Sequence, residues 1–144
     1  MSTKTAALLF GIVFAVVGFL GFVPAPPPPD APPLAVEHGH GLALGMFPVN
    51  TLHNVVHLLF AVLGIAAWAG GWARGYFQLL AVSYAVLAVM GLIPGTQTTF
   101  GLIPLWGNDV WLHAAIAGVS AYFGFARGNV DVHTHTHTAA HGRV

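Results

Sequence analysis

The sequence predicts an all-α membrane protein in which four transmembrane helices form a bundle. The chain has 144 residues, of which 56% are hydrophobic and only 6% are charged. Soluble domains carry about 25% charged residues, so this chain has too few charges to cover a surface exposed to water. Each of its four apolar stretches is close to the ~20 residues that cross a bilayer; they cover residues 5–23, 49–70, 75–93 and 108–126.

The first apolar stretch, residues 5–23, is predicted to be a retained helix. It is longer than the ~7–15-residue apolar core of a signal peptide, and no A-x-A cleavage pattern follows it. A proline-rich segment follows at residues 24–33 and predicts a stiff polyproline II spacer. The next residues, 34–46, are apolar and rich in glycine, so we expect them to lie along the membrane interface.

The other three helices are separated by turn-forming residues. Gly70, Gly71 and Gly75 lie between the second and third stretches, and Pro94-Gly95 follows the third. The fourth stretch is the only one that contains a charged residue, Asp109, close to its beginning. These boundaries predict one four-helix transmembrane domain over residues 1–127 and a histidine-rich tail over residues 128–144.

All the basic residues lie at one end of the predicted bundle. Lys4 precedes the first helix, Arg74 separates the second and third, and Arg127 and Arg143 follow the fourth. Short cytoplasmic segments of membrane proteins carry the excess of Lys and Arg. The sequence therefore predicts a multi-pass protein of the bacterial inner membrane with both termini in the cytoplasm and the two longer loops outside.

The two halves of the chain resemble each other. The first and third helices end in Gly21-Phe22-Val23-Pro24 and Gly91-Leu92-Ile93-Pro94, and the second and fourth are preceded by Gly45-Met46-Phe47-Pro48 and Gly101-Leu102-Ile103-Pro104. Counted from the second proline of each half, His57 and His113 have the same offset. The pattern favours a duplicated helical hairpin with two parallel repeats, although shared chemistry at helix ends would produce part of it.

Four ionisable residues are expected to meet near the outer ends of the second and fourth helices. His53 and His57 are four residues apart, as are Asp109 and His113, so each pair lies on one helical face. Ionisable residues within a membrane span are costly to insert and are functional candidates by default. The sequence therefore predicts that these four side chains converge at one site.

Four interpretations of this cluster remain open. The three histidines and Asp109 could bind a transition metal, with Asn54 or Asn108 supporting the ligands. His57 and His113 could be the axial ligands of a haem, or the His–Asp pairs could form a proton or quinol site. In the fourth interpretation the histidines only lock helices together, while the asparagines act as structural caps, namely Asn50, Asn54 and Asn108.

The tail carries alternating histidines that predict a weak metal site. His133, His135 and His137 would point the same way along an extended chain, and histidine-rich tracts bind Zn, Cu or Ni. Because the tail is expected in the cytoplasm and the helical cluster outside, the two should not form one site.

No catalytic motif is present in the sequence. It contains no GxSxG, Walker or HExxH pattern, no cysteine, and too few basic residues for a nucleic-acid surface. The first interpretation is therefore a small non-enzymatic membrane protein that acts as a structural or accessory subunit of a larger complex or as a homo-oligomer. A haem- or metal-binding membrane protein is the alternative, and a proton or quinol site is the second alternative.

Three motifs together resemble a known family. They are FPVNTLHNVVHLLF at residues 47–60, GLIPG at residues 91–95 and GLIPLWGNDVWLH at residues 101–113. The chain is similar here to a bacterial family of small four-helix membrane proteins of unknown function. The resemblance covers about residues 5–125 and implies four spans but no activity; the proline-rich loop and the histidine tail depart from the family pattern.

Overall fold

The computed structural model describes residues 1–127, so the histidine tail lies outside the described part of the chain. The described part is mostly helical. Its helices are α1 (Thr3–Leu20), α2 (Thr51–Gly70), α3 (Ala73–Leu92) and α4 (Asn108–Ala121), with a π-helical turn η1 (Tyr122–Ala126) continuing α4. Two short strands, β1 (Gly41–Ala43) and β2 (Phe47–Val49), precede α2. The four helices occupy ranges close to those that the apolar stretches predict.

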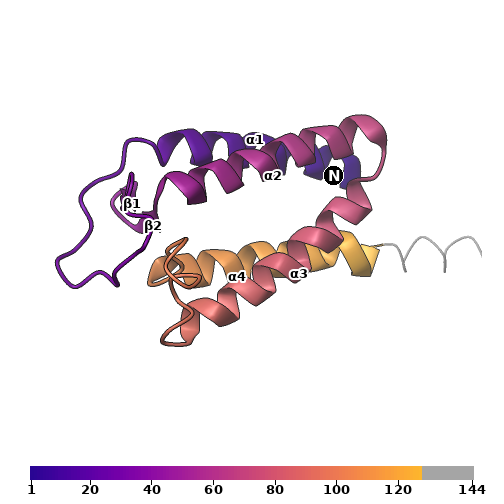
Figure 1. Ribbon diagram of the computed structural model, residues 1–144. Helices are drawn as coiled ribbons and strands as arrows, with labels where there is room; N and C mark the ends of the chain where they lie inside the picture. Colours follow the sequence, from indigo (N-terminus) through magenta and orange to yellow (C-terminus); the bar gives the residue numbers. More distant parts are fainter. Residues whose placement is uncertain (128–144) are drawn as a thin grey trace, which may run out of the picture.

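The helices are arranged as two hairpins lying side by side (Figure 1). The most extensive contacts are those of α1 with α2 and of α3 with α4. The two long connections, residues 21–50 and 93–107, lie at one end of the molecule, and the N-terminus and the α2–α3 turn lie at the other (Figure 1). The β-hairpin and both long connections therefore cover the ends of α2 and α4 where the histidines lie.

Small residues let α1 and α2 approach closely. A Cβ atom added to Gly64 would lie 2.9 Å from the Cα of Gly11, 3.0 Å from the carbonyl oxygen of Ala7 and 2.8 Å from the hydroxyl of Tyr76. That hydroxyl donates a hydrogen bond to the carbonyl of Phe60, at 3.1 Å. The contact between Gly11 and Gly64 thus lets α1 and α2 pack closely, and Tyr76 brings α3 against the same place. Close packing at small residues is typical of helices in membranes.

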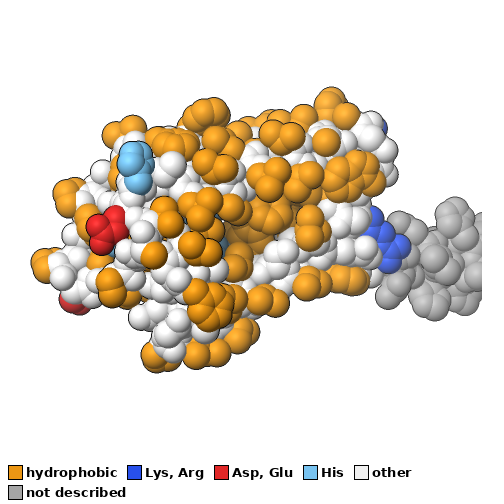
Figure 2. Space-filling view, viewed as in Figure 1, with side chains coloured by type: hydrophobic (Ala, Val, Ile, Leu, Met, Phe, Trp, Pro, Cys, Tyr) orange, Lys and Arg blue, Asp and Glu red, His pale blue; other side chains and the backbone are white. Residues whose placement is uncertain are grey.

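The apolar core occupies the half of the molecule away from the long loops. It is built mainly from small and aromatic side chains of α1, α2, α3 and η1, with side chains of α4 packed against it: Ala6, Ala7, Phe14, Ala61, Ala67, Ala73, Tyr76, Phe77, Leu80, Tyr84 and Phe123. Large apolar side chains also cover much of the outer surface (Figure 2). A protein that is apolar on both its inside and its outside is suited to a lipid environment.

Three of the helices are long and apolar enough to cross a membrane, namely α1, α2 and α3. The fourth is shorter and less uniform than the sequence predicts, because α4 has 14 α-helical residues and then changes to the π-helical turn η1. At this turn the carbonyl of Gly124 accepts hydrogen bonds from Arg74 Nε, at 3.0 Å, and from Gln78 Nε2, at 3.1 Å. Two side chains of α3 thus bond the backbone of η1.

The β-hairpin is a feature that the sequence analysis does not predict. Its residues 41–46 belong to the segment expected to lie along the membrane interface, and its strands pair antiparallel with Gly41 opposite Val49. The turn requires positive φ at Leu44 (53°) and Gly45 (70°), a conformation that glycine adopts without strain. The proline-rich segment joins the hairpin through paired backbone hydrogen bonds between Ala25 and Leu42.

The charged side chains are separated between the two ends. Lys4 and Arg74 belong to the first turns of α1 and α3, and Arg127 follows η1. Figure 2 shows basic side chains at this end, and acidic and histidine side chains at the end with the long loops. The structure therefore brings these three basic residues to one end of the bundle.

Candidate functional site

The site begins at Asn50, which joins three segments of the chain. Its Oδ1 accepts a hydrogen bond from the backbone N–H of His53, at 2.8 Å, so Asn50 is the N-cap of α2. Its Nδ2 donates to the carbonyls of Val36, at 2.9 Å, and Leu102, at 2.7 Å. The fully buried Asn50 thus ties both long loops to the first turn of α2.

Three of the four predicted ionisable residues meet closely. Ligand atoms of His53, Asp109 and His113 all lie within 4.8 Å of one another. Within α4, His113 Nε2 lies 3.5 Å from Asp109 Oδ2, which is an ion-pair distance and not a well-formed hydrogen bond. All three residues are at most 3% exposed. The structure therefore forms a buried group of two imidazoles and one carboxylate between α2 and α4.

His57 lies beside this group and not within it. Its ring centroid is 4.4 Å from that of His53, but on its other side it stacks on Phe14 of α1, at 5.9 Å and 24°. The sequence pattern matched His57 with His113 because they share an offset in the two repeats. The structure instead pairs His113 with His53, because His57 is engaged with α1.

Two of the three predicted asparagine caps do not cap helices. Gly107 holds the N-cap position of α4, and Asn108 is the first helical residue; its Nδ2 donates a long hydrogen bond of 3.5 Å to the carbonyl of Met46. Asn54 lies inside α2, where the backbone N–H already bonds the carbonyl of Asn50. Its side chain is buried against Gly21 at the end of α1, where no Cβ would fit.

The cluster holds several buried polar atoms without hydrogen-bond partners among residues 1–127. They include the Nδ1 atoms of three histidines, one carboxylate oxygen and both side-chain atoms of an amide: His53, His57, His113, Asp109 and Asn54. An unsatisfied buried polar group costs about 1–3 kcal/mol. So many at one place indicate a site built to interact with something beyond the chain's own side chains.

A small cavity adjoins the cluster. It has a volume of about 90 Å³ and is lined in part by His53, His57, Tyr84 and His113. This volume suits an ion and a few waters, because a water molecule occupies about 30 Å³. Pockets for drug-sized ligands measure roughly 300–1,000 Å³, so this cavity favours a small ion over a haem between His57 and His113.

Two aromatic residues at the site were not singled out by the sequence analysis. Tyr84 of α3 contacts His113 edge to face, with the ring centroids 4.9 Å apart, and Phe14 of α1 stacks on His57. Both are buried. They carry little signal in the sequence, because aromatic residues are common in apolar helices and nothing in their spacing marks these two. The predicted tail ligands His133, His135 and His137 lie outside the described residues.

Comparison with known proteins matches the chain to a family model. No curated protein and no solved structure matches the chain. Residues 4–126 match the family described as a domain of unknown function, DUF4383, and this range includes all four helices and the whole histidine and aspartate cluster. The chain therefore belongs to the DUF4383 family.

Proposed function

We propose that this protein is a four-span integral membrane protein that binds one divalent transition-metal ion through His53, Asp109 and His113. The observation that carries the proposal is the convergence of these three ligand atoms within 4.8 Å in a buried place. Two imidazoles and a carboxylate are a common ligand set for Zn²⁺ and for Fe²⁺. Metal–ligand bonds of about 2.1 Å separate ligands by at most about 4.2 Å, so small side-chain rotations would complete the site.

The buried polar atoms around the three residues favour a bound metal over the interpretation in which the histidines only hold the helices together. The Nδ1 atoms of His53 and His113 have no hydrogen-bond partner in the described chain, and Asp109 Oδ2 makes no hydrogen bond there beyond its 3.5 Å approach to His113 Nε2. Within a low-dielectric interior such groups are strongly destabilised unless they are paired or coordinate a metal. The cavity of about 90 Å³ beside His53 and His113 offers room for the waters that would complete the coordination.

The proposed placement has both termini in the cytoplasm of a bacterial cell and the metal site near the outer surface. Lys4, Arg74 and Arg127 support this orientation through the excess of basic residues on the cytoplasmic side. In this placement α4 and η1 together form the fourth span, and Asp109 lies at its outer end. The protein then acts without catalysis, as an accessory or structural subunit of a membrane assembly whose metal ion joins α2 to α4.

The direct experiment measures zinc content in the full-length protein. His133, His135, His137 and His141 are first replaced by alanine, so that metal bound by the tail does not enter the count. Purified in mild detergent, exposed to zinc and dialysed, this chain is expected to retain one ion. His53→Ala and His113→Ala are each expected to weaken binding by at least about tenfold, since each loses a direct ligand.

His57→Phe is the matched control, because it replaces a neighbouring histidine that lies outside the group of three. It is expected to retain zinc. Zinc is also expected to raise the unfolding temperature of the parent chain and not that of His53→Ala, because ligands that bind only the folded state stabilise it. If the parent chain binds no zinc, iron or copper, and His53→Ala only lowers its stability, the cluster is a helix lock and the metal proposal is wrong.

A further inference from the structure

A groove between α1 and α4 leads from the surface of the helices to the polar cluster. Two cavities of about 170 Å³ each share Val17, His57 and Leu112 in their linings, so they adjoin along the two helices. The extensive helix contacts are within the hairpins, and α1 and α4 make few contacts with each other. Apart from His57 and Asp109 the linings are apolar side chains of α1, α4 and the β-hairpin.

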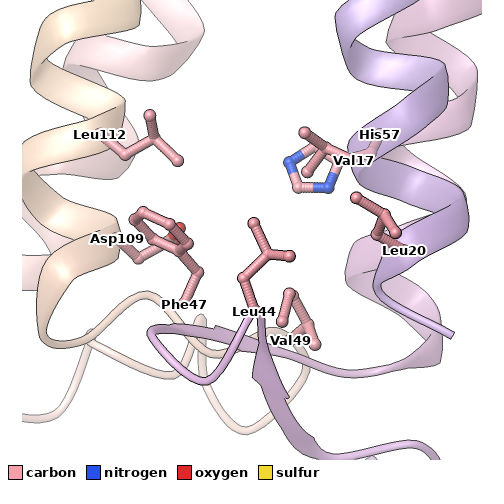
Figure 3. Close-up of a pocket in the computed structure, with 9 residues that line it drawn as sticks. Val17, Leu20, Leu44, Phe47, Val49, His57, Asp109 and Leu112 are labelled. Carbon is pink, nitrogen blue, oxygen red and sulfur yellow. The ribbon is translucent and has the colours of Figure 1, made fainter. Parts of the chain in front are cut away.

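The outer end of the groove is covered by the β-hairpin. Figure 3 shows Asp109 and Leu112 on one side of the cavity and Val17, Leu20 and His57 on the other, with Leu44, Phe47 and Val49 across its end. Access therefore runs sideways between α1 and α4, through the face that contacts lipid in the proposed membrane placement. A molecule that enters must be soluble in the bilayer.

The groove contains a polar point at which such a molecule could be held. His57 lines both groove cavities and the inner cavity beside the cluster. It is 6% exposed, and its Nδ1 has no hydrogen-bond partner among residues 1–127. Asp109, 2% exposed, lines the groove as well, and its Oδ2, 3.5 Å from His113 Nε2, makes no hydrogen bond among residues 1–127. An imidazole and a carboxyl group at the floor of an apolar groove select a ligand with an apolar body and a small polar head.

We propose that this groove binds the head group of a membrane quinone or quinol. A quinone carbonyl accepts a hydrogen bond from an imidazole N–H, and a quinol hydroxyl donates one to an imidazole nitrogen or a carboxylate. The flat ring suits the space between the apolar walls, next to Phe14 and Phe47, and the prenyl tail continues into the bilayer. The inference rests on the proposed membrane placement. Its main polar contact, His57, is not one of the three metal ligands, whereas Asp109 belongs to both proposed sites.

A phospholipid is a poorer match to the same groove. Its head group stays at the membrane surface, whereas His57 lies about 9 Å along α2 from Thr51, at ~1.5 Å per residue. Its acyl chain could fill the apolar part but would leave His57 and Asp109 unpaired. A fatty acid would bring a second carboxyl group next to Asp109, which like-charge repulsion disfavours. A neutral head that both donates and accepts hydrogen bonds avoids both problems.

The test uses the full-length protein in phospholipid nanodiscs with an azido-substituted decyl benzoquinone as a photoprobe. Label incorporated on illumination is located by peptide mass spectrometry. We expect saturable labelling of α1 and α4 peptides that excess decyl benzoquinone prevents and decane does not. Val17→Trp, which fills the part shared by both cavities, is expected to lower labelling at least about tenfold, and His57→Phe is expected to do the same by removing the polar partner.

Val16→Trp is the matched control, because Val16 is half exposed on the outer face of α1 and lines neither cavity. It is expected to label within about twofold of the parent chain. Leu112→Trp blocks the groove from α4 and replaces Val17→Trp if that variant does not fold. Labelling that decane prevents as well as the quinone does, or that both blocking variants retain, would overturn the proposal.

The two proposals fail separately. His53→Ala is expected to lose zinc and keep quinone labelling, whereas His57→Phe is expected to keep zinc and lose labelling. If no chain, including the parent and Val16→Trp, shows saturable labelling while the parent chain still binds zinc, the quinone site is refuted and the metal proposal stands.

Discussion

At the scale of single residues, Asn50 and Asn108 show how far a sequence repeat can be trusted. Both precede or begin a helix that follows a Gly-x-x-Pro segment, and the sequence predicts the same capping role for both. In the structure Asn50 is fully buried with three hydrogen bonds. Asn108 is exposed, with one bond of 3.5 Å. The difference arises from Gly107, which adopts φ 67° and takes the N-cap position itself.

Asn50→Ala is therefore expected to destabilise the protein strongly. It removes the N-cap of α2, worth about 1 kcal/mol, and leaves two loop carbonyls without donors, each costing about 1–3 kcal/mol. A loss of at least about 3 kcal/mol in the free energy of unfolding is expected from these terms, measured by denaturant titration in detergent. Asn108→Ala is the matched control and should change the stability by less than about 0.5 kcal/mol. Equal effects of the two substitutions would contradict this assignment.

The cluster itself was predictable only in part. Steps of four residues place His53 with His57 and Asp109 with His113 on single helical faces, and this spacing needs no structure. Which side chains of α2 contact which side chains of α4 depends on how the two hairpins approach each other and on side-chain contacts from a third helix. The stacking of His57 on Phe14 is such a contact, and it separates His57 from the three residues that meet. Helical spacing cannot predict it.

At the scale of secondary structure elements, the glycines of α1 and α2 determine how closely the first hairpin packs. Hydropathy predicts that these helices exist but not which of their glycines lies at a close contact. Gly64 is buried against Gly11 and Tyr76, whereas Gly118 of α4 is exposed and a Cβ there would meet nothing within 4 Å. The β-hairpin and η1 were not predictable for a related reason. Both depend on partners distant in the sequence, as in the bonds from Arg74 and Gln78 to the carbonyl of Gly124.

Gly64→Ala is expected to destabilise the protein by about 1–3 kcal/mol, the range for adding a methyl group to a tightly packed place. The substitution would force α2 away from α1 and disturb the hydrogen bond from Tyr76 to Phe60. Gly118→Ala should be neutral, or stabilising by up to about 1 kcal/mol, because alanine favours the helix. Thermal unfolding of the two variants side by side provides the comparison. A Gly64→Ala protein as stable as Gly118→Ala would show that the helices are not in close contact here.

At the scale of the whole molecule, the number of spans and their orientation decide where the cluster lies. The sequence contains no cysteine, so a single introduced cysteine reports the location of its own segment. With four spans, Asp30→Cys and Gly95→Cys should react on intact cells with a maleimide that does not cross membranes. Ser2→Cys and Gly128→Cys should react only after the cells are permeabilised.

The outcome at Gly128 tests the fourth span in particular. Three helices meet the length and hydropathy expected of a span. If all three cross the membrane, residues 2 and 95 lie on opposite sides of it, whether or not α4 also crosses. Reaction of Gly128→Cys on intact cells would mean that α4 and η1 return to the outer side without crossing. Asp109 and His113 would then still lie near the outer surface, but the two hairpins would not be equivalent repeats.

The most direct measurement of the central claim is zinc X-ray absorption on the full-length protein in which the four tail histidines are replaced by alanine. We expect scattering from two imidazole rings and a carboxylate oxygen at about 2.0–2.2 Å, with one imidazole contribution lost in His53→Ala. A zinc spectrum without imidazole scattering, or one that is identical in His53→Ala, would contradict the assignment of His53, Asp109 and His113 as the metal ligands.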